Sequence, residues 1–387
     1  MNPPRAITLA LTQDQAMLAR TAAAFAAERL PLPRVRKLRE STDGLGYSRE
    51  AWTEIARLGW TGIPFAEADG GAGLGLAEVV LVTEALGRCL APEPFVASVM
   101  LAGQVLALAG DELQRSSALT PLVAGDKIVA LALHERGARY DAHRVTTRAE
   151  KGPAGRYRIT GAKSHVAAGY RADALVVAAR TSGESADAAG ITLFLVPADA
   201  PGLTIAKQHL VDTRNAALVE LAGVEVSESA VVGRVGEGAE VLDEAIDRAT
   251  VALCGEMLGA MSEAFDRTLA YLKERTQFGV AIGTFQGLKH RAARIFVEIE
   301  LARSAVMAAA RAVDERLPLG RALVSVAKAR CSDAYVHVAN EAVQMHGGIG
   351  MTDEHDIGLF MKHARATEMT FGDAALHRTR FATLGGF

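Results

Sequence analysis

The sequence of 387 residues contains only three cysteines, Cys89, Cys254 and Cys331. They are far apart in the sequence and lack the spacing of metal ligands, and an odd number of thiols cannot all form pairs. This excludes a disulfide framework of the kind that stabilises small secreted proteins. We therefore expect a cytoplasmic protein whose thiols stay reduced.

The sequence also has little net charge and no long apolar run. Its net charge is −3, so it lacks the strong positive charge that favours binding to nucleic acid or anionic membranes, and we expect neither partner. The most apolar segment, residues 95–109, is shorter than a membrane-spanning helix and predicts a buried helix. The apolar run that ends before Gln13 is too short for a signal peptide, so we do not expect secretion.

Motifs of several enzyme classes are missing. The sequence has no Gly-x-Ser-x-Gly nucleophile motif and no His-Glu-x-x-His or paired-cysteine metal motif. We expect no metal, and we interpret His337, His346, His355 and His363 as solvated or hydrogen-bonded side chains. The glycine-rich residues 69–75 follow helical sequence and not a strand, which favours a structural turn over a dinucleotide-binding loop.

The sequence shows three successive patterns of residue types. Half of the residues are hydrophobic, and the length favours more than one domain. Helical periodicity predicts an N-terminal helical domain over residues 1–125. Short β-rich runs predict a middle β domain, an antiparallel sheet, barrel or sandwich, over residues 126–233. Long helical patterns then predict a C-terminal four-helix bundle over residues 234–387. The predicted fold class is α+β.

The element boundaries are predicted from the same periodicities. Long helices are predicted at residues 239–274, 286–315 and 322–344, and strands at residues 128–133, 156–160, 174–178, 191–196, 203–205 and 224–226.

Residues 271–286 separate two of these long helices with residue types that contact ligands. Arg275 can donate paired hydrogen bonds to a phosphate. Phe278 and Phe285 offer flat faces to a ring system, and Gly279 allows the backbone to approach a ligand closely. This composition fits a nucleotide site, and it fits a helix-loop-helix corner equally well.

A second segment, residues 344–352, follows the last long helix. Gly347, Gly348 and Gly350 lie within four residues of one another. A helix stop explains one such glycine and not three. We therefore expect a loop whose backbone N–H groups face a phosphate or a ring.

These two segments resemble the acyl-CoA dehydrogenase family of flavoproteins. The resemblance covers essentially the whole chain, and within the family it is most specific to the small subunits of heteromeric members, such as that of pimeloyl-CoA dehydrogenase. The pattern Arg-x-x-Phe-Gly-x-x-Ile-x-x-Phe-Gln is matched by Arg275, Phe278, Gly279, Ile282, Phe285 and Gln286, and the pattern Gln-x-x-Gly-Gly by Gln344, Gly347 and Gly348.

The resemblance implies an FAD-dependent oxidation of the Cα–Cβ bond of an acyl-CoA thioester, with electrons passed to an electron-transfer flavoprotein. In the family a carboxylate removes the α proton, hydride leaves Cβ for the flavin, and hydrogen bonds to the thioester carbonyl stabilise the enolate. It also implies a tetramer in which FAD held by a neighbouring subunit is contacted by Arg275, Phe278, Gln286, Gln344, Gly347 and Gly348.

The chain departs from the family at the catalytic base. The usual glutamate corresponds here to Phe371, which cannot accept a proton. Some members instead carry an acidic residue followed by arginine at the start of the first long C-terminal helix, and Asp247 and Arg248 lie near that position. Asp247 is thus a candidate base, with a surface or helix-start carboxylate as the favoured alternative. Arg248 and Tyr140 are candidate substrate contacts.

The β domain departs as well. The family's Thr-Glu-Pro-x-x-Gly-Ser-Asp strand corresponds to residues 134–141, which begin with His134. Its Trp-Ile-Thr segment, where a hydroxyl approaches the flavin, corresponds to His165-Val166-Ala167. The resemblance therefore implies that this chain has lost the contacts to its own flavin ring while keeping those to a neighbour's FAD.

Three functions follow from these departures. The first is a subunit of a heteromeric acyl-CoA dehydrogenase whose partner carries the base. The second is a self-sufficient homotetramer that uses Asp247 or Asp373 as its base. The third is a catalytically silent acyl-CoA-binding or assembly protein, which the phenylalanine at position 371 favours.

Overall fold

The computed structural model describes residues 8–41, 44–152 and 155–387. The chain divides into two compact units. The sheet unit consists of Leu38–Leu74 and Pro92–Ala249, and the helical unit consists of Met1–Lys37, Gly75–Ala91 and Thr250–Phe387. The mixed α and β architecture predicted from the sequence is confirmed.

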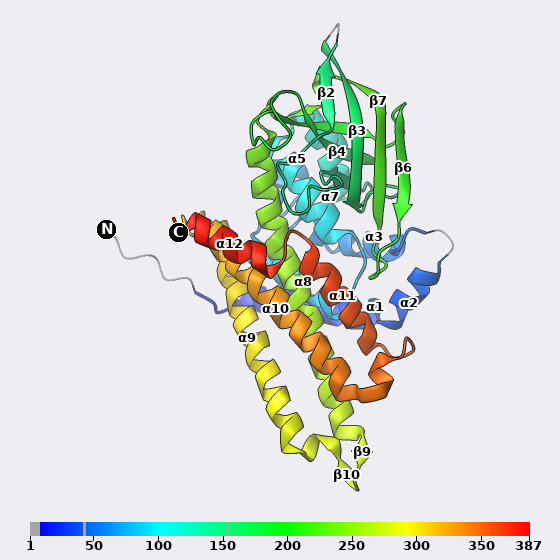
Figure 1. Ribbon diagram of the computed structural model, residues 1–387, viewed down its shortest axis with the longest axis vertical. Helices are drawn as coiled ribbons and strands as arrows, with labels where there is room; N and C mark the ends of the chain where they lie inside the picture. The colour runs from blue at the N-terminus through cyan, green and yellow to red at the C-terminus, as the bar shows by residue number, and fades with distance from the viewer. Residues whose placement is uncertain (1–7, 42–43, 153–154) are drawn as a thin grey trace. The chain divides into compact units, whose positions relative to one another are not determined.

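The sheet unit combines short helices with one eight-stranded sheet among its described residues (Figure 1). Its helical elements are α3 (Arg49–Arg57), η1 (Trp60–Gly62), η2 (Glu67–Asp69), η3 (Phe95–Gly103), α5 (Gln104–Ala109), α6 (Glu112–Gln114), η4 (Arg115–Leu119), α7 (Thr120–Val123) and η6 (Glu228–Ala230). Its strands are β1 (Val129–Ala132), β2 (Arg148–Lys151), β3 (Arg156–Ala167), β4 (Ala174–Arg180), β5 (Ile191–Pro197), β6 (Leu203–Gln208), β7 (Ala216–Ser227) and β8 (Val231–Val232).

The sheet is mostly antiparallel, in the order β6-β7-β3-β2-β4-β5-β8, with β1 beside β4. The sheet departs in two places from the antiparallel arrangement that the sequence predicts, because β4 pairs in parallel with both β1 and β2. Alternating burial along β3 reflects one packed and one exposed face. By contrast, β4 and β5 are buried along nearly their whole length. These strands therefore form the core of the sheet unit.

The loop between β4 and β5 is organised around Arg180. This side chain is buried and donates hydrogen bonds to the carbonyl oxygens of Val145, Ala189 and Asp187 at 3.1, 2.9 and 2.8 Å. Burial lowers the pKa of Arg180 from its ordinary value. The buried Arg180 cation thus holds this loop from inside.

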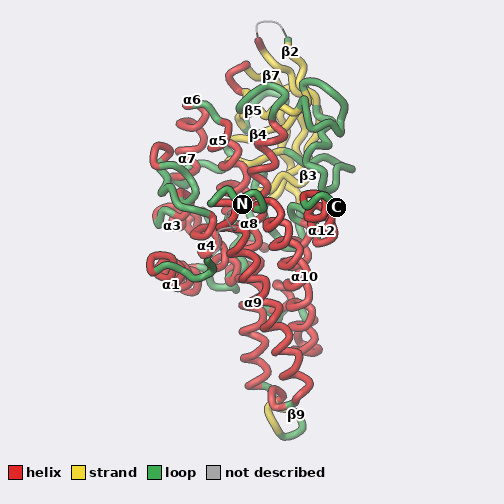
Figure 2. Tube along the Cα trace, turned by 90° about the vertical axis from the view of Figure 1, so that its left-hand side faces the viewer, coloured by secondary structure: helices red, strands yellow, loops and turns green. Residues whose placement is uncertain are grey.

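The helical unit is built mainly from long helices (Figure 2). Residues predicted as helices at 239–274, 286–315 and 322–344 form α8 (Gly238–Glu274), α9 (Gln286–Asp314) and α10 (Gly320–His346), and α8 begins in the sheet unit. The other elements are α1 (Gln13–Arg29), α2 (Pro33–Glu40, whose last residues belong to the sheet unit), α4 (Leu76–Arg88), β9 (Thr276–Gln277), β10 (Val280–Ala281), η7 (Ile282–Thr284), η8 (Gly347–Met351), α11 (Ile357–Met369) and α12 (Ala374–Leu384).

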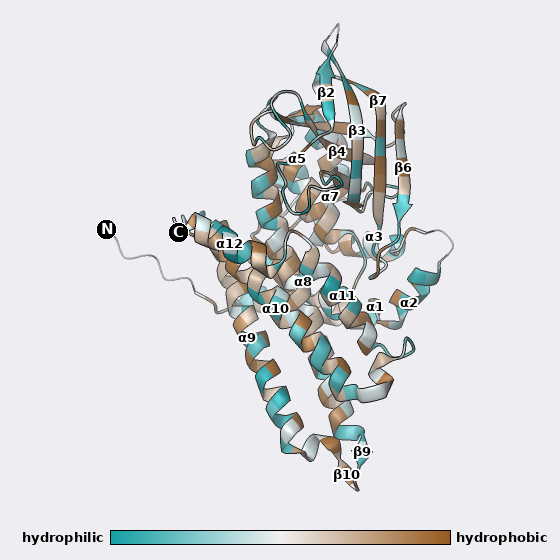
Figure 3. Cartoon of the chain, in the orientation of Figure 1, coloured by the Kyte–Doolittle hydropathy of each residue, from teal (hydrophilic) through white to brown (hydrophobic). Residues whose placement is uncertain are grey.

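Glycines let α4 and α8 approach each other closely. A Cβ at Gly87 would lie 2.0 Å from the carbonyl oxygen of Glu256, and one at Gly259 would lie 1.8 Å from that of Glu84. Such distances are far inside van der Waals contact, so any larger residue would force the helices apart. Figure 3 shows hydrophobic and hydrophilic residues alternating along α9, as expected for a helix with one packed face.

A buried polar network crosses the bundle. Both ring nitrogens of His363 form hydrogen bonds, Nδ1 with the hydroxyl of Tyr335 at 2.9 Å and Nε2 with the carboxylate of Glu256 at 2.8 Å. His346 is buried as well. The sequence interpretation of hydrogen-bonded histidines holds for these residues.

Among the described residues, no helix is long and apolar enough to cross a membrane. In the same part of the chain, no group of His, Cys, Asp or Glu side chains is arranged to hold a metal ion.

Candidate functional site

Within residues 271–286, residues 276–281 form a β-hairpin between α8 and α9, so the segment is not a plain helix-loop-helix corner (Figures 1 and 2). Strands β9 and β10 are antiparallel, and Val280 pairs with Gln277. The connecting residues Phe278 and Gly279 both have left-handed backbones, with φ values of 54° and 79°. This is the geometry of a tight hairpin turn, in which phenylalanine is an unusual residue. The side chain of Phe278 is 92% exposed.

The hairpin fixes the backbone around Arg275 and leaves its side chain exposed. The Arg275 N–H donates to the Tyr271 carbonyl at 2.9 Å, and the Arg275 carbonyl accepts from Ile282 N–H at 2.8 Å. Gln286, at the start of α9, is exposed too. The predicted phosphate-binding cation is thus held at a defined backbone position with its guanidinium open to a ligand.

The glycine segment, residues 347–350, follows the end of α10, and its three glycines have different structural roles. Gly347 ends the helix with a φ of 68°, as a helix stop requires. Gly350 packs against the helix end, because a Cβ there would lie 2.9 Å from the Val343 carbonyl oxygen. At Gly347 and Gly348, by contrast, an added Cβ would meet no atom within 4 Å. Gly348 neither ends the helix nor packs against it, and the exposed backbone of Gly347 and Gly348 is available to a ligand.

Aromatic stacking brings the hairpin and the glycine segment together. The rings of Tyr271 and His346 are stacked with centroids 4.4 Å apart, and the Tyr271 hydroxyl donates to the His346 carbonyl at 3.3 Å. His346 Nδ1 lies 2.7 Å from the Ala342 carbonyl oxygen. Burial lowers the pKa of His346, the hydrogen bond to Ala342 opposes this, and His355 adds to the lowering. A neutral His346 therefore donates from Nδ1 and underlies the glycine segment.

The turn that contains Phe371 keeps an uncommon backbone. Phe371 has a φ of 58° and Gly372 a φ of 103°. Lys328 Nζ is buried and donates to the carbonyls of Gly372 at 2.7 Å and Glu368 at 3.0 Å. His377 Nε2 lies 3.0 Å from the Phe371 carbonyl oxygen. The turn is therefore held by donors on both sides.

The charges near this turn are also structural. Asp373 caps α12, because its side chain accepts from the Leu376 N–H at 2.9 Å. Burial, with the Lys328 charge, lowers the pKa of His377 to about 4. Burial lowers the pKa of Lys328 too. His377 is thus a neutral donor at physiological pH, and Asp373 already serves as a helix cap.

In the sheet unit, His134 and His165 begin the two segments where the resemblance implies lost flavin contacts. His134 Nδ1 is buried and has no hydrogen-bond partner among the described residues. Burial lowers the pKa of His134 to about 4, and the charges of His165 and Lys163 act in the same direction. His165 has a left-handed φ of 54°, and its N–H donates to Gln208 Oε1 at 3.0 Å. Both histidines favour the neutral form.

Glu135, next to His134, is tied into the sheet. It pairs with buried Lys163 at 2.7 Å and accepts hydrogen bonds from the N–H groups of Thr146 and Thr147 at 2.7 and 3.0 Å. Burial opposes ionisation of Glu135, but the Lys163 charge and these hydrogen bonds outweigh it and lower the pKa to about 2. This carboxylate stabilises the sheet and is a poor proton acceptor.

The remaining candidates lie in the sheet unit. The alternative interpretation of Asp247 as a surface or helix-start carboxylate is wrong: it is 5% exposed and lies within α8, well after the helix begins at Gly238. Arg248 pairs with Glu244, one turn earlier, at 2.7 Å. Tyr140 is half-buried, and the Arg139 guanidinium lies 5.4 Å from its ring centre.

Comparison with known proteins identifies the family of this chain. The models for the N-terminal, middle and C-terminal domains of acyl-CoA dehydrogenase match residues 12–126, 130–223 and 236–383. The probable acyl-CoA dehydrogenase YngJ of Bacillus subtilis is 30% identical over 346 residues, which cover 88% of this chain and 90% of that protein. The chain belongs to the acyl-CoA dehydrogenase family.

Two solved structures are similar over nearly their whole length. Butyryl-CoA dehydrogenase from Megasphaera elsdenii superposes with a TM-score of 0.90 at 28% identity and covers 98% of this chain and 99% of that one. The ChsE4-ChsE5 complex from Mycobacterium tuberculosis gives a TM-score of 0.87 at 27% identity, with coverage of 98% and 99%.

Acyl-CoA dehydrogenases are FAD-dependent oxidoreductases, and membership in the family places this protein among them. The helical unit fits part of that cofactor. Arg275 is an exposed cation, and the open backbone at Gly347 and Gly348 offers N–H groups to a phosphate. These residues would hold the phosphate-bearing half of FAD.

Sequence reasoning missed Lys328, although the signal was present. It lies on the predicted long helix in register with Val324, Cys331 and Tyr335, which form an apolar stripe at helical spacing. A lysine on such a stripe is buried and needs hydrogen-bond acceptors. That pattern in the sequence indicates a structural cation.

Proposed function

We propose that this chain is one subunit of a heteromeric acyl-CoA dehydrogenase, in which it completes the FAD site of a different subunit. The observation that carries the proposal is the contrast between two sets of residues. Those that correspond to the family's contacts with a neighbour's FAD are present and exposed, at Arg275 and Gly348. Those that correspond to contacts with the chain's own flavin ring and to the base are replaced, at His134, His165 and Phe371.

Exposed hydrophobic residues near the hairpin and the glycine segment support an oligomer. Phe278 at 92% exposure and Met351 at 71% would be costly on the surface of a monomer. Covering them with a partner subunit removes that apolar area from water. The exposed hydrophobic residues of these segments and of α9 are Phe278, Val280, Phe285, Phe296, Val297, Leu301, Ile349 and Met351.

The division of chemistry follows from the proposal. FAD supplies the acceptor for the hydride that leaves Cβ of the acyl-CoA thioester. The partner subunit supplies the glutamate that takes the α proton, because Phe371 cannot. This chain binds and orients the phosphate-bearing half of FAD through Arg275, Phe278, Gln286, Gln344, Gly347 and Gly348.

The finer assignments are likewise proposals. Resemblance to the small subunit of pimeloyl-CoA dehydrogenase favours a medium-chain or dicarboxylyl thioester, with Tyr140 and Arg248 as substrate contacts and an electron-transfer flavoprotein as electron acceptor. The complex named ChsE4-ChsE5 is similar to this chain and joins two differently named proteins. We propose a heterotetramer, with domains at residues 1–125, 126–233 and 234–387.

The position of the base gives a direct test of this proposal. In the coexpressed complex, Asp247→Asn should leave the rate of acyl-CoA oxidation within about twofold, because Asp247 is not the base. Replacing the family glutamate of the partner by glutamine should lower kcat by at least about 100-fold, the size of a lost general base. Steady-state kinetics with a panel of acyl-CoA thioesters measures both.

The alternative, a self-sufficient homotetramer, predicts the reverse outcome. Burial of Asp247 is the observation that favours it, since a carboxylate within α8 lies away from bulk water. A 100-fold loss with Asp247→Asn and no need for a partner would establish that alternative. Asp373 is the weaker choice because it caps α12. A catalytically silent binding protein has no evident use for the exposed Arg275.

A further inference from the structure

The glycine segment is followed by a short loop, residues 352–356, that leads into α11. Local contacts hold it in part. Thr352 donates to the Ile349 carbonyl from its N–H at 3.1 Å and from its hydroxyl at 2.8 Å, and Lys362 Nζ on α11 donates to the Asp353 carboxylate at 2.7 Å. A loop of this kind needs contacts from elsewhere to hold one conformation.

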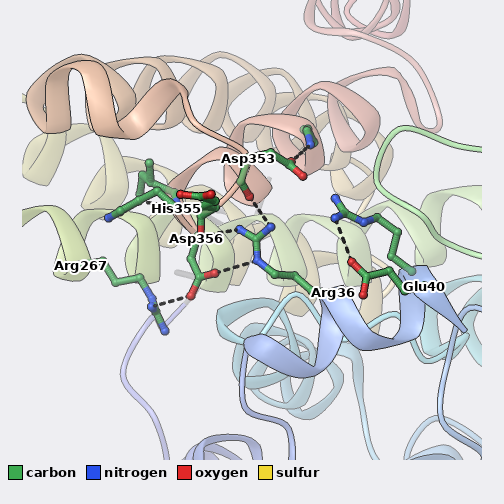
Figure 4. A network of polar contacts seen from close by, with 10 residues as sticks. Arg36, Glu40, Arg267, Asp353, His355 and Asp356 are labelled. Carbon is green, nitrogen blue, oxygen red and sulfur yellow. Dashed lines mark hydrogen bonds and ion pairs between the residues drawn. The ribbon is translucent and has the colours of Figure 1, made fainter.

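Arg36, on α2, supplies those contacts from more than 300 positions away in the sequence (Figure 4). Its Nε donates to the Asp356 carboxylate at 3.2 Å. Its two terminal nitrogens donate to the backbone carbonyls of Asp353 and, at 3.3 Å, Glu354. The guanidinium fork therefore binds three residues of the loop at once, in a planar geometry that a lysine does not have.

Two further contacts join this loop to α8 and to the end of α10. Arg267, on α8, lies 3.6 Å from the other oxygen of Asp356, so that carboxylate is shared between two arginines. The His355 ring lies 4.8 Å from that of His346, which stacks on Tyr271. Figure 4 shows Arg36, Asp356 and Arg267 as one chain of contacts. The loop is thus held on one side by ion pairs and on the other by the contact of the His355 ring with His346.

We infer that Arg36 is a positioning residue for the backbone of Gly347 and Gly348. By fixing the 352–356 loop against α2 it keeps the glycine N–H groups in the conformation that binds phosphate, so that the partner's FAD meets a preorganised site. The inference rests on the proposed function for its link to FAD. Its structural part, the fixing of the loop, stands on the contacts of Arg36 alone.

Amide hydrogen exchange on the full-length chain tests the structural part without a partner or FAD. Arg36→Met should speed exchange about tenfold across residues 347–356, the effect of losing charge-assisted hydrogen bonds, while amides of α9 keep their rates. Lys37→Met is the matched control, since it removes an exposed cation from the same helix and should change neither region. Arg36→Lys, which keeps the charge without the fork, should fall between Arg36→Met and the unaltered chain.

Unchanged exchange at residues 347–356 in Arg36→Met, or an equal rise in α9, would overturn the inference.

In the coexpressed complex, Arg36→Met should weaken FAD binding about tenfold while the two subunits still copurify. A complex that holds no FAD even with the unaltered chain contradicts the proposed function, and the exchange data then still decide the role of Arg36. FAD binding that is unaffected by Arg36→Met, in a complex that does hold FAD, contradicts the inference alone.

Discussion

Replacing Arg275 by methionine is expected to weaken FAD binding to the assembled complex by about 10- to 100-fold. That range corresponds to a lost charge-assisted hydrogen bond to a phosphate. Because the Arg275 side chain is exposed, the substitution should leave the stability of the isolated chain unchanged. Titration of the flavin-free complex with FAD, followed by flavin fluorescence, measures the dissociation constant.

Lys273→Met is the matched control for Arg275. It removes a positive charge two residues away, at an exposed position in the last turn of α8. If charge alone attracts the cofactor, both substitutions should weaken binding similarly, and raising the salt concentration should erase the difference from the unaltered complex. If the Arg275 guanidinium binds a phosphate through paired hydrogen bonds, Arg275→Met should lose much more FAD affinity than Lys273→Met. Equal FAD affinity in Arg275→Met and the unaltered complex would contradict the assigned role.

Glu135→Gln is expected to lower the free energy of unfolding of the sheet unit by about 3–5 kcal/mol. The reason is that Lys163, fully buried in the sheet, would lose the charge that compensates it. The amide would also place a donor among the N–H groups of Thr146 and Thr147. Urea unfolding followed by tryptophan fluorescence measures this directly, because both tryptophans of the sequence, Trp52 and Trp60, belong to the sheet unit.

Two variants sharpen this experiment. Glu228→Gln breaks the exposed pair with Lys151, whose side chains are 60% and 54% exposed, and should cost less than about 1 kcal/mol. The double variant Glu135→Gln with Lys163→Met removes the buried charge as well and should be more stable than Glu135→Gln alone. If Glu135→Gln costs no more than Glu228→Gln, the buried pair does not stabilise the sheet.

The same carboxylate gives the stability of the sheet unit a pH dependence. The pKa of Glu135 is lowered from 4.5 to about 2 in the folded chain. The stabilisation is therefore present above pH 4.5 and is lost as the pH falls through about 2. The difference in the free energy of unfolding between the unaltered chain and Glu135→Gln should therefore become smaller as the pH falls from 4.5 to about 2. A constant difference would show that folding does not lower the pKa of Glu135.

Elements with clear periodicity could be predicted from the sequence. The three long helices were placed within a few residues of their ends, because apolar residues recur at helical spacing between glycine and proline stops. Strand β2 was not predicted, since Arg148–Lys151 contains one apolar residue among three charged ones. It pairs through its backbone with β3, and such pairing leaves no mark on side-chain pattern.

The candidate site was predictable in composition and not in geometry. Residue types at Arg275 and Gly348 indicated a phosphate before the fold was known. The left-handed backbone of Phe278 was not foreseeable, because phenylalanine seldom adopts it and no local pattern requires it. Burial of Asp247 was missed because α8 is packed on nearly all sides beyond that point, where helical periodicity no longer separates inside from outside.

The central claim is that this chain completes another subunit's FAD site and has lost its own. The most direct measurement is the amount of FAD bound, and the rate of acyl-CoA oxidation, for the chain purified alone and after coexpression with acyl-CoA dehydrogenase-like chains from neighbouring genes. The account predicts a colourless, inactive lone chain and a yellow, active complex with one such partner. Full flavin occupancy with turnover by the lone chain would contradict it.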